Sequence, residues 1–337
     1  RNDAEAEHTL ANIASYFVLS NTDDYLGANA KKFEIGRLER VRCEVPFEAH
    51  IDLRDILAVC QGAEGLALMT LDDLYGIMGA LVGGWPEGMD PDLRIRLSGR
   101  IDRLETRLSS DGVRRLRIID YKSGASKPTV KHMLNDLQLV CYQLGLRFEH
   151  RLGAEDDMSA TRGSRVRGSG VHESDVAAAP AHGDASVSDA DILSAQPSPS
   201  IEQSELFYMR NSAAPAMSRD PEGLYQPALF VDGHINDRVF TPRNYIPRPD
   251  NLEVPELADE PPAGVSERTW RALLGLRGTQ AIWTITMIAR VWYAAAASRS
   301  NLLIAHPTSE HLGFCRMLSV CPACAGHSET IFDMRKS

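Results

Sequence analysis

The clearest alternation of apolar and polar positions lies close to residue 100. Residues 94–108 alternate in the manner of a half-buried β-strand, with Ile101 on the apolar face. Asp111 and Gly112 then give the commonest signal for a tight hairpin turn, and residues 113–122 continue as a second strand. The pattern predicts a β-hairpin of two long strands.

The same periodicities predict helices and further strands on both sides of this hairpin. Helices are expected over residues 4–19, 53–81, 128–148 and 266–297, and strands over residues 40–51, 206–209 and 224–230. Pro128 suits the first turn of a helix, and Ser266 suits the cap that precedes one. We therefore expect an α/β fold.

One internal segment has a composition that is not typical of a folded domain. Residues 151–205 contain no Phe, Tyr or Trp and are dominated by Ala, Ser, Asp and Gly. Such a segment cannot bury enough apolar surface to offset the entropy lost on ordering. Because a core-like strand resumes at Leu206, we expect a disordered insertion inside one domain.

Two acids and a lysine fall at one end of the predicted hairpin. The two-residue period of a strand places Asp120 and Lys122 on one side of the sheet, and pairing brings Asp102 near them. Adjacent carboxylates repel unless a cation lies between them, and their oxygens suit Mg²⁺ or Mn²⁺. Such a metal would polarise a phosphate, while Lys122 would orient or deprotonate the attacking water, or stabilise the charge that develops on the phosphate.

An exposed D-x-K strand by itself is usually only a solvated face. Here Gln138 and Tyr142 follow at i and i+4 on the next predicted helix, so that their side chains share one face. The combination of the hairpin residues with Gln138 and Tyr142 favours a functional site over a set of ordinary solvent-exposed side chains.

The motifs G-x-I-D-R, D-Y-K-S-G and Q-L-x-x-Y occur in this order and resemble the RecB-type branch of the PD-(D/E)xK nucleases. Within it, the chain is most similar to the nuclease domain of bacterial helicase–nucleases of the AddAB and AdnAB kind. The resemblance implies a restriction-endonuclease-like core with a mixed central sheet flanked by helices. It implies that Asp102 and Asp120 bind the metal, that Lys122 is the catalytic lysine, and that Gln138 and Tyr142 support the site and contact DNA.

The resemblance also suggests how the chain is divided. Residues 1–150 would hold the first part of the nuclease core, residues 151–205 the insertion, and residues 206–337 the remainder with a helical, cysteine-containing tail. Glu44, on the strand before the hairpin, is similar to a further acidic residue of these nucleases, and we expect it to be a metal ligand. The metal-binding histidine of the family has no clear counterpart, because His8 lacks the usual G-x-x-x-H setting. We expect His8 at a helix surface and the true histidine upstream of a chain that begins without Met.

The cysteines raise the question of a second metal centre. The tail holds Cys315, Cys321 and Cys324 in the spacing C-x₅-C-x₂-C, whereas many relatives bind a [4Fe–4S] cluster through C-x₂-C-x₅-C near their C-terminus. Three alternatives remain: a cluster in the full-length protein, a zinc site that includes His327, or free thiols. The other cysteines, expected to be buried and inert, are Cys43, Cys60 and Cys141.

Composition and charge limit the class of protein. The chain has 337 residues, 43% of them hydrophobic, and no apolar run long enough for a membrane span. No signal peptide is apparent in the sequence. Six cysteines with three in the tail are typical of a reducing compartment, so we expect a cytoplasmic protein. The net charge of −10 argues against a nucleic-acid partner, but arginines and lysines gather around the predicted hairpin. That local basic zone would suit a DNA backbone, although ordinary exposed strand arginines would give the same pattern.

We therefore expect a Mg²⁺- or Mn²⁺-dependent deoxyribonuclease of the exonuclease type, within a helicase–nuclease that processes DNA double-strand breaks for repair. The chain has no phosphate-binding Gly-rich loop with Lys-Ser or Lys-Thr, so the helicase motor would lie upstream in the same polypeptide or in a partner subunit. One alternative is a catalytically silent DNA-binding or scaffold domain of such a complex. Another is a standalone exonuclease of the CRISPR-associated kind, with the same chemistry and different partners.

Overall fold

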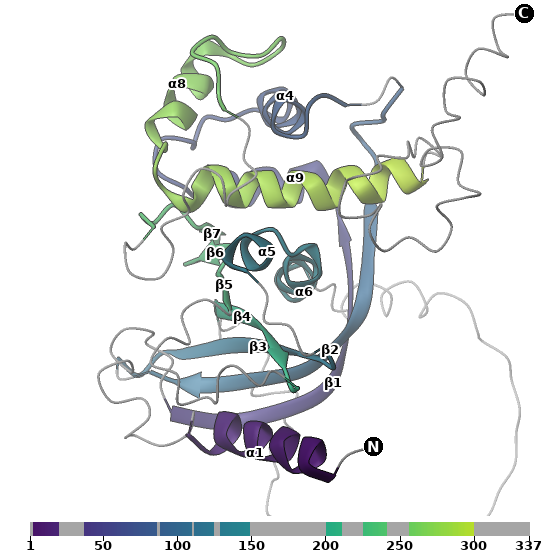
Figure 1. Ribbon diagram of the computed structural model, residues 1–337. Helices are drawn as coiled ribbons and strands as arrows, with labels where there is room; N and C mark the ends of the chain where they lie inside the picture. The colour runs from purple at the N-terminus through teal and green to yellow at the C-terminus, as the bar shows by residue number, and fades with distance from the viewer. Residues whose placement is uncertain are drawn as a thin grey trace, which may run out of the picture.

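A mixed five-stranded sheet forms the centre of the fold, in the strand order β1-β2-β3-β4-β5 (Figure 1). The computed structural model describes residues 3–19, 37–85, 88–109, 111–124, 129–148, 200–210, 225–240 and 256–299. The strands of this sheet are β1 (Arg37–Ile51), β2 (Ile95–Leu108), β3 (Arg114–Lys122), β4 (Ser200–Tyr208) and β5 (Tyr225–Pro227). β3 and β4 are parallel, whereas the other neighbouring pairs are antiparallel. A second, two-stranded sheet pairs β6 (Phe230–Val231) with β7 (His234–Ile235).

Helices flank the sheet on both sides. They are α1 (Asp3–Leu19), α3 (Leu53–Gln61), α4 (Leu71–Leu81), α5 (Val130–Leu134), α6 (Leu137–Arg147), α8 (Glu267–Gly275) and α9 (Gln280–Arg299). In Figure 1, α5 and α6 lie over one face of the sheet, α9 crosses above them, and α1 lies on the opposite side. This arrangement confirms the predicted α/β class, with a mixed central sheet flanked by helices.

The predicted hairpin is present. β2 and β3 pair from Leu108↔Arg114 up to Arg103↔Ile119. Gly112 has φ 79° in the turn between them, a value that glycine adopts without strain. β1 pairs with β2 along nearly its whole length and continues well past the end of β3. The free part of this two-stranded ribbon curves toward α9 (Figure 1).

Strand β2 departs from simple alternation at Asp102. Ile101 and Leu104 both belong to the apolar cluster under α6, although three positions separate them. In a regular strand, residues three apart point to opposite faces, so the backbone must turn between them. The neighbouring strand is irregular at the same place, because Glu44 has φ 53° and leaves the ladder there. This distortion sets the direction of the Asp102 carboxylate.

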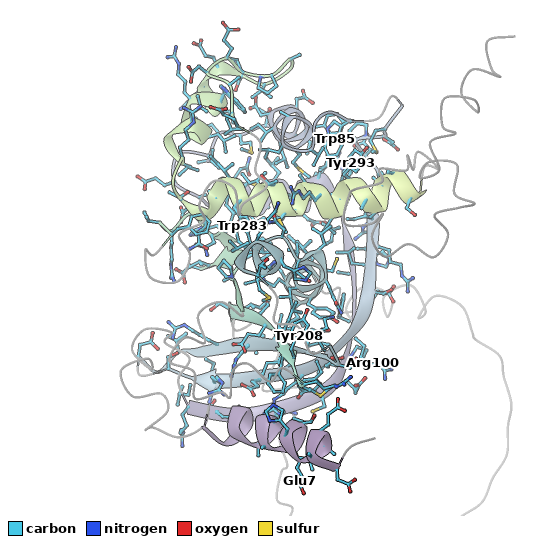
Figure 2. All side chains as sticks on the ribbon, in the orientation of Figure 1. Glu7, Trp85, Arg100, Tyr208, Trp283 and Tyr293 are labelled. Atoms are coloured by element: carbon cyan, nitrogen blue, oxygen red, sulfur yellow. The ribbon has the colours of Figure 1, made fainter. Side chains whose placement is uncertain are left out.

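Two apolar cores hold the layers together. The core between the sheet and α6 contains Phe47, Ile101, Leu104, Leu116, Ile118, Met133, Leu139, Tyr142, Ile201 and Leu206. A larger core surrounds α9 and includes Trp270, Trp283 and Trp292, which are fully buried. Trp283 lies between α9 and the α5–α6 layer, where its Nε1 donates to the backbone oxygen of Leu134 at 3.0 Å (Figure 2). The aromatic residues of α9 therefore serve packing.

Several predicted helices are shorter than the sequence pattern suggested. Residues 53–81 form two helices, α3 and α4, each with its own capping box. Residues 266–297 also form two, because Gly278 has φ 85° between α8 and α9, while Ser266 caps α8 as predicted. The helix expected from residue 128 is likewise divided into α5, capped by Thr129, and α6, capped by Asp136. In each case a capping side chain begins a new helix, or a left-handed glycine lies between the two helices.

The boundary of the predicted insertion was also wrong, since β4 begins at Ser200 rather than at Leu206. Residues 151–199 and the predicted tail site of Cys315, Cys321 and Cys324 lie outside the described residues. Cys43 is exposed, contrary to expectation, because it lies on the outer part of the edge strand β1. Cys60 is buried and Cys141 partly so. Along the part of the chain that the structure describes, no helix combines the length and apolarity that crossing a membrane requires.

Candidate nuclease site

Strand β3 and helix α6 together build a compact polar site. Asp120 and Lys122 lie near the C-terminal end of β3, and the strand period directs both toward α6. α6 begins at Leu137 because the Asp136 side chain caps it by accepting from the backbone N–H of Leu139 at 2.9 Å. The first turns of this helix then carry Gln138 and Tyr142 over the strand.

Four side chains form one hydrogen-bond network. Oδ1 of Asp120 accepts from Gln138 Nε2 at 2.8 Å and from the Tyr142 hydroxyl at 2.9 Å. Lys122 Nζ donates to Gln138 Oε1 at 2.6 Å and lies 2.6 Å from Asp120 Oδ2. The i, i+4 spacing of Gln138 and Tyr142 is what allows both to reach the same carboxylate oxygen.

Burial raises the pKa of Tyr142 above its ordinary value, and the negative charge of Asp120 adds to this effect, while the hydrogen bond from Gln138 opposes it. The phenol therefore stays protonated at neutral pH and keeps donating to Asp120. Since both donors from α6 reach Oδ1, the carboxylate of Asp120 is held in one orientation.

Asp102 joins the site from the neighbouring strand. Its Oδ2 accepts from the backbone N–H of Tyr121 at 2.8 Å. The β2–β3 ladder ends at Arg103↔Ile119, so the Asp102 side chain bonds β3 just where strand pairing stops. Four of the predicted site residues thus share one network, and Asp102 is fixed to the strand between two of them.

One protein-family model matches the part of the chain that contains this site. Residues 25–190 match the family model described as the PD-(D/E)XK nuclease superfamily. Over these residues the chain is similar to the PD-(D/E)XK nuclease superfamily. The match spans β1, β2, β3 and α6, and it identifies the superfamily without a particular branch. Neither the curated proteins nor the solved structures gave a significant match.

Members of this superfamily are typically metal-dependent nucleases, and the donor atoms of the nuclease domain fit a hard divalent cation. Oδ2 of Asp120 is buried and receives no aligned hydrogen bond, although the Lys122 ammonium lies beside it. Within the part of the chain that the structure describes, Asp102 accepts a hydrogen bond through Oδ2 alone. Mg²⁺ commonly keeps several waters and takes only one or two protein carboxylates. Among the described residues, no three His, Cys, Asp or Glu side chains are gathered so that they could hold a metal ion.

The structure places Glu44 on the strand next to Asp102, but the Glu44 side chain pairs with Arg100. The pairs Cys43↔Arg103 and Val45↔Ile101 put Glu44 opposite Asp102. Its carboxylate lies 3.5 Å from Arg100, and both side chains are well exposed. A metal-ligand role for Glu44 remains a prediction. His8 lies exposed on α1, as expected for a helix-surface residue.

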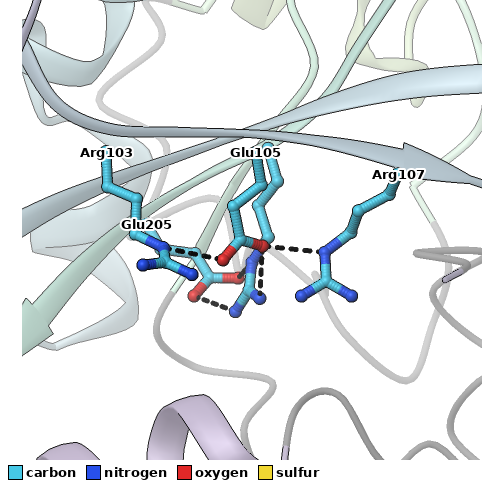
Figure 3. Close-up of polar contacts among 5 residues, drawn as sticks. Arg103, Glu105, Arg107 and Glu205 are labelled. Atoms are coloured by element: carbon cyan, nitrogen blue, oxygen red, sulfur yellow. Dashed lines mark hydrogen bonds and ion pairs between the residues drawn. The ribbon is translucent and has the colours of Figure 1, made fainter. Parts of the chain in front are cut away.

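The predicted basic zone around the nuclease site is wrong for several of its arginines. Arg107 and Arg117 are buried with Glu105 and Glu205 on the other face of the sheet, and the partly buried Arg103 lies beside them. We call these five residues the buried charge cluster (Figure 3). Strand parity explains the error, because Arg117 alternates with Ile118 and Asp120, which face α6. The charges of this cluster therefore compensate one another instead of facing a DNA backbone.

Glu105 is the centre of the buried charge cluster. It accepts from Arg103 Nε and Arg107 Nε at 2.8 Å each, and it lies 3.4 Å from Arg117 NH1. Arg117 also bonds Glu205 through two donors, at 2.8 and 2.7 Å. Burial alone would raise the pKa of Glu105, but the surrounding guanidinium groups lower it to about 2. The spacing R-x-E-x-R on one predicted strand was the available sequence signal for this cluster.

Proposed function

We propose that this chain is a Mg²⁺- or Mn²⁺-dependent deoxyribonuclease of the exonuclease type. One observation carries the proposal: two donors from α6 hold Oδ1 of the buried Asp120, while Oδ2 receives no aligned hydrogen bond. In this structure the Lys122 ammonium lies 2.6 Å from that oxygen and compensates its charge, and the oxygen keeps the lone pairs with which it would bind a divalent metal. The nearby Asp102 offers a second carboxylate, which would complete a two-carboxylate site.

Each residue then has a defined task. Asp102 and Asp120 would hold the cation. The cation would polarise the phosphate and lower the pKa of a bound water. Lys122, held between Asp120 and Gln138, would orient that water or neutralise charge that develops on the phosphate. Gln138 and Tyr142 would fix Asp120 through hydrogen bonds, and Gln138 would also fix Lys122.

We further propose that the domain works within a helicase–nuclease that processes DNA breaks, with the motor in the same polypeptide or in a partner subunit. The support is the RecB-type pattern of its motifs together with the superfamily match. The helicase–nuclease, purified with any partner subunit, should unwind DNA with ATP, and Lys122→Ala should abolish cutting while unwinding persists.

A catalytically silent DNA-binding domain is the second candidate. It is favoured by the pairing of Glu44 with Arg100 and by the lack of a third gathered ligand among the described residues. The two candidates differ in whether divalent metal binds at Asp102 and Asp120 and whether DNA is then cut.

The deciding experiment measures cleavage of end-labelled linear single- and double-stranded DNA with Mn²⁺. Lys122→Ala tests the site, and Lys131→Ala removes the same charge from an exposed position on α5 as a matched control. Calorimetry with Mn²⁺ on the protein and on Asp120→Asn reports binding separately. Cleavage lost only in Lys122→Ala, with Mn²⁺ binding lost in Asp120→Asn, supports the nuclease. DNA binding without Mn²⁺ binding or cleavage supports the silent domain.

A further inference from the structure

We propose that Tyr208 is a nucleotide-binding residue of this site, and that its ring stacks on the base of an unpaired nucleotide beside the phosphate that is cut. The inference rests on the proposed nuclease function and narrows its substrate to DNA that is single-stranded, or frayed, at the point of cleavage. It begins from the register of the parallel strands β3 and β4.

That register places Tyr208 beside the catalytic lysine of the proposal. Tyr208 is the partner of Lys122, and Leu206 is the partner of Asp120. Partners in neighbouring parallel strands point to the same face, so Tyr208 lies on the face that α6 covers. Figure 2 labels Tyr208 below α6, with Arg100 nearby in the same view.

The Tyr208 ring lies beside the segment that follows β3 and is only partly buried. The ring lies 3.4 Å from the position that a Cβ on Gly124 would take, in the segment just after β3. Burial raises the pKa of Tyr208, the positive charge of Lys122 lowers it, and the negative charges of Asp136 and Asp120 raise it. The residue as a whole remains only half-buried.

Other aromatic rings near the strands have packing partners that account for them. Tyr121 and Phe207 point to the opposite face and meet edge to face, with ring centroids 6.3 Å apart. Tyr142 is buried in the network and packs on Phe47. Tyr208 packs on the edge of the core under α6, but no ring contact and no hydrogen bond of its hydroxyl is present among the described residues.

A partly exposed ring beside the proposed phosphate-cleaving site is suited to stacking on a base. Every base has a π-face, so such stacking tolerates any sequence and contributes substantially to single-strand binding. Bases inside a duplex are already stacked on their neighbours, so only an unpaired nucleotide can present its face to Tyr208. A phenol is protonated at neutral pH, so the Tyr208 hydroxyl can donate to a phosphate oxygen.

The test uses a single-stranded oligonucleotide that carries 2-aminopurine, whose fluorescence falls when the base stacks. Binding is measured with Ca²⁺ in place of Mg²⁺ or Mn²⁺, and cleavage is measured separately with Mn²⁺. Tyr208→Phe keeps the ring, Tyr208→Leu removes it, and Tyr293→Leu is the matched control on α9, where the ring stacks on Trp85. Thermal unfolding shows whether each variant is folded.

We expect the unchanged protein, Tyr208→Phe and Tyr293→Leu to quench the fluorescence, and Tyr208→Leu to lose the quenching. With Mn²⁺, the loss should appear as a rise of about tenfold in KM on single-stranded DNA, with a smaller change in kcat. If Tyr208→Leu is folded and quenches the fluorescence like the unchanged protein, stacking by Tyr208 is refuted. If Tyr208→Leu is unfolded, Tyr208→Phe decides, and loss of quenching in that variant also refutes stacking. If the unchanged protein quenches but does not cut, the proposed nuclease function fails while base stacking stands. If it neither binds nor cuts, both fail.

Discussion

Replacing Glu105 by Gln removes the negative charge at the centre of the buried charge cluster. Glu105 has no exposed surface, and the cluster holds three arginines against two glutamates, so the change raises its net charge from +1 to +2. Removing one partner of a buried ion pair typically costs about 3–5 kcal/mol, because the remaining charges stay buried without compensation. The lowered pKa agrees with this, since a fall from 4.5 to about 2 corresponds to about 3 kcal/mol. We therefore expect Glu105→Gln to lower the free energy of unfolding by about 3 kcal/mol at pH 7.

Urea unfolding followed by tryptophan fluorescence measures this loss, because Trp270, Trp283 and Trp292 are buried in the folded protein. Glu48→Gln is the matched control: it breaks an equally short ion pair with Arg96, but at the surface, and should leave the midpoint almost unchanged. The pKa of Glu105 is lower in the folded protein than its ordinary value, so its contribution is complete above pH 4.5 and is lost as the pH falls toward 2. That part of the pH dependence should be absent in Glu105→Gln. Equal midpoints for the two variants would refute the reasoning.

Two further substitutions test the packing and geometry of the site. Gly145→Ala should destabilise the protein by about 1–3 kcal/mol in the same urea assay, because the new Cβ would lie 2.2 Å from the ring of Phe47, whereas Gly275→Ala faces open space and should not. Tyr142→Phe removes one of two donors to Asp120 Oδ1 and should slow DNA cleavage by about tenfold or more in a labelled-DNA assay while the protein stays folded. An unchanged cleavage rate would mean that the hydroxyl does not position Asp120.

The parts of the fold that the sequence predicted well are those set by local period. Both strands of the hairpin end within one residue of their predicted limits, because alternation and the Asp111–Gly112 signal act over a few residues. Helix lengths were overestimated where the apolar period continued through a break. The left-handed φ of Gly278 lies between α8 and α9. The apolar period of the flanking residues continues through this break, so the period alone does not predict it.

The site shows the same division between local and distant information. Gln138 and Tyr142 could be placed on one face from their spacing alone, and the structure brings both to Asp120. The bend that turns Asp102 toward the amide of Tyr121 breaks the strand alternation, and a two-residue period cannot predict such a bend.

The remaining features depend on β4, which follows the long segment between residues 148 and 200. Glu205 meets Arg117, and Tyr208 meets Lys122, only because β4 pairs in parallel with β3 in one particular register. A shift of that register by a single residue would move Tyr208 to the other face and Glu205 onto the side of α6. The buried pair of Arg117 and Glu205 is costly in any such shifted register, since each charge would be left uncompensated. The buried charge cluster on one face of the sheet thus stabilises the register that places Tyr208 beside Lys122 on the other.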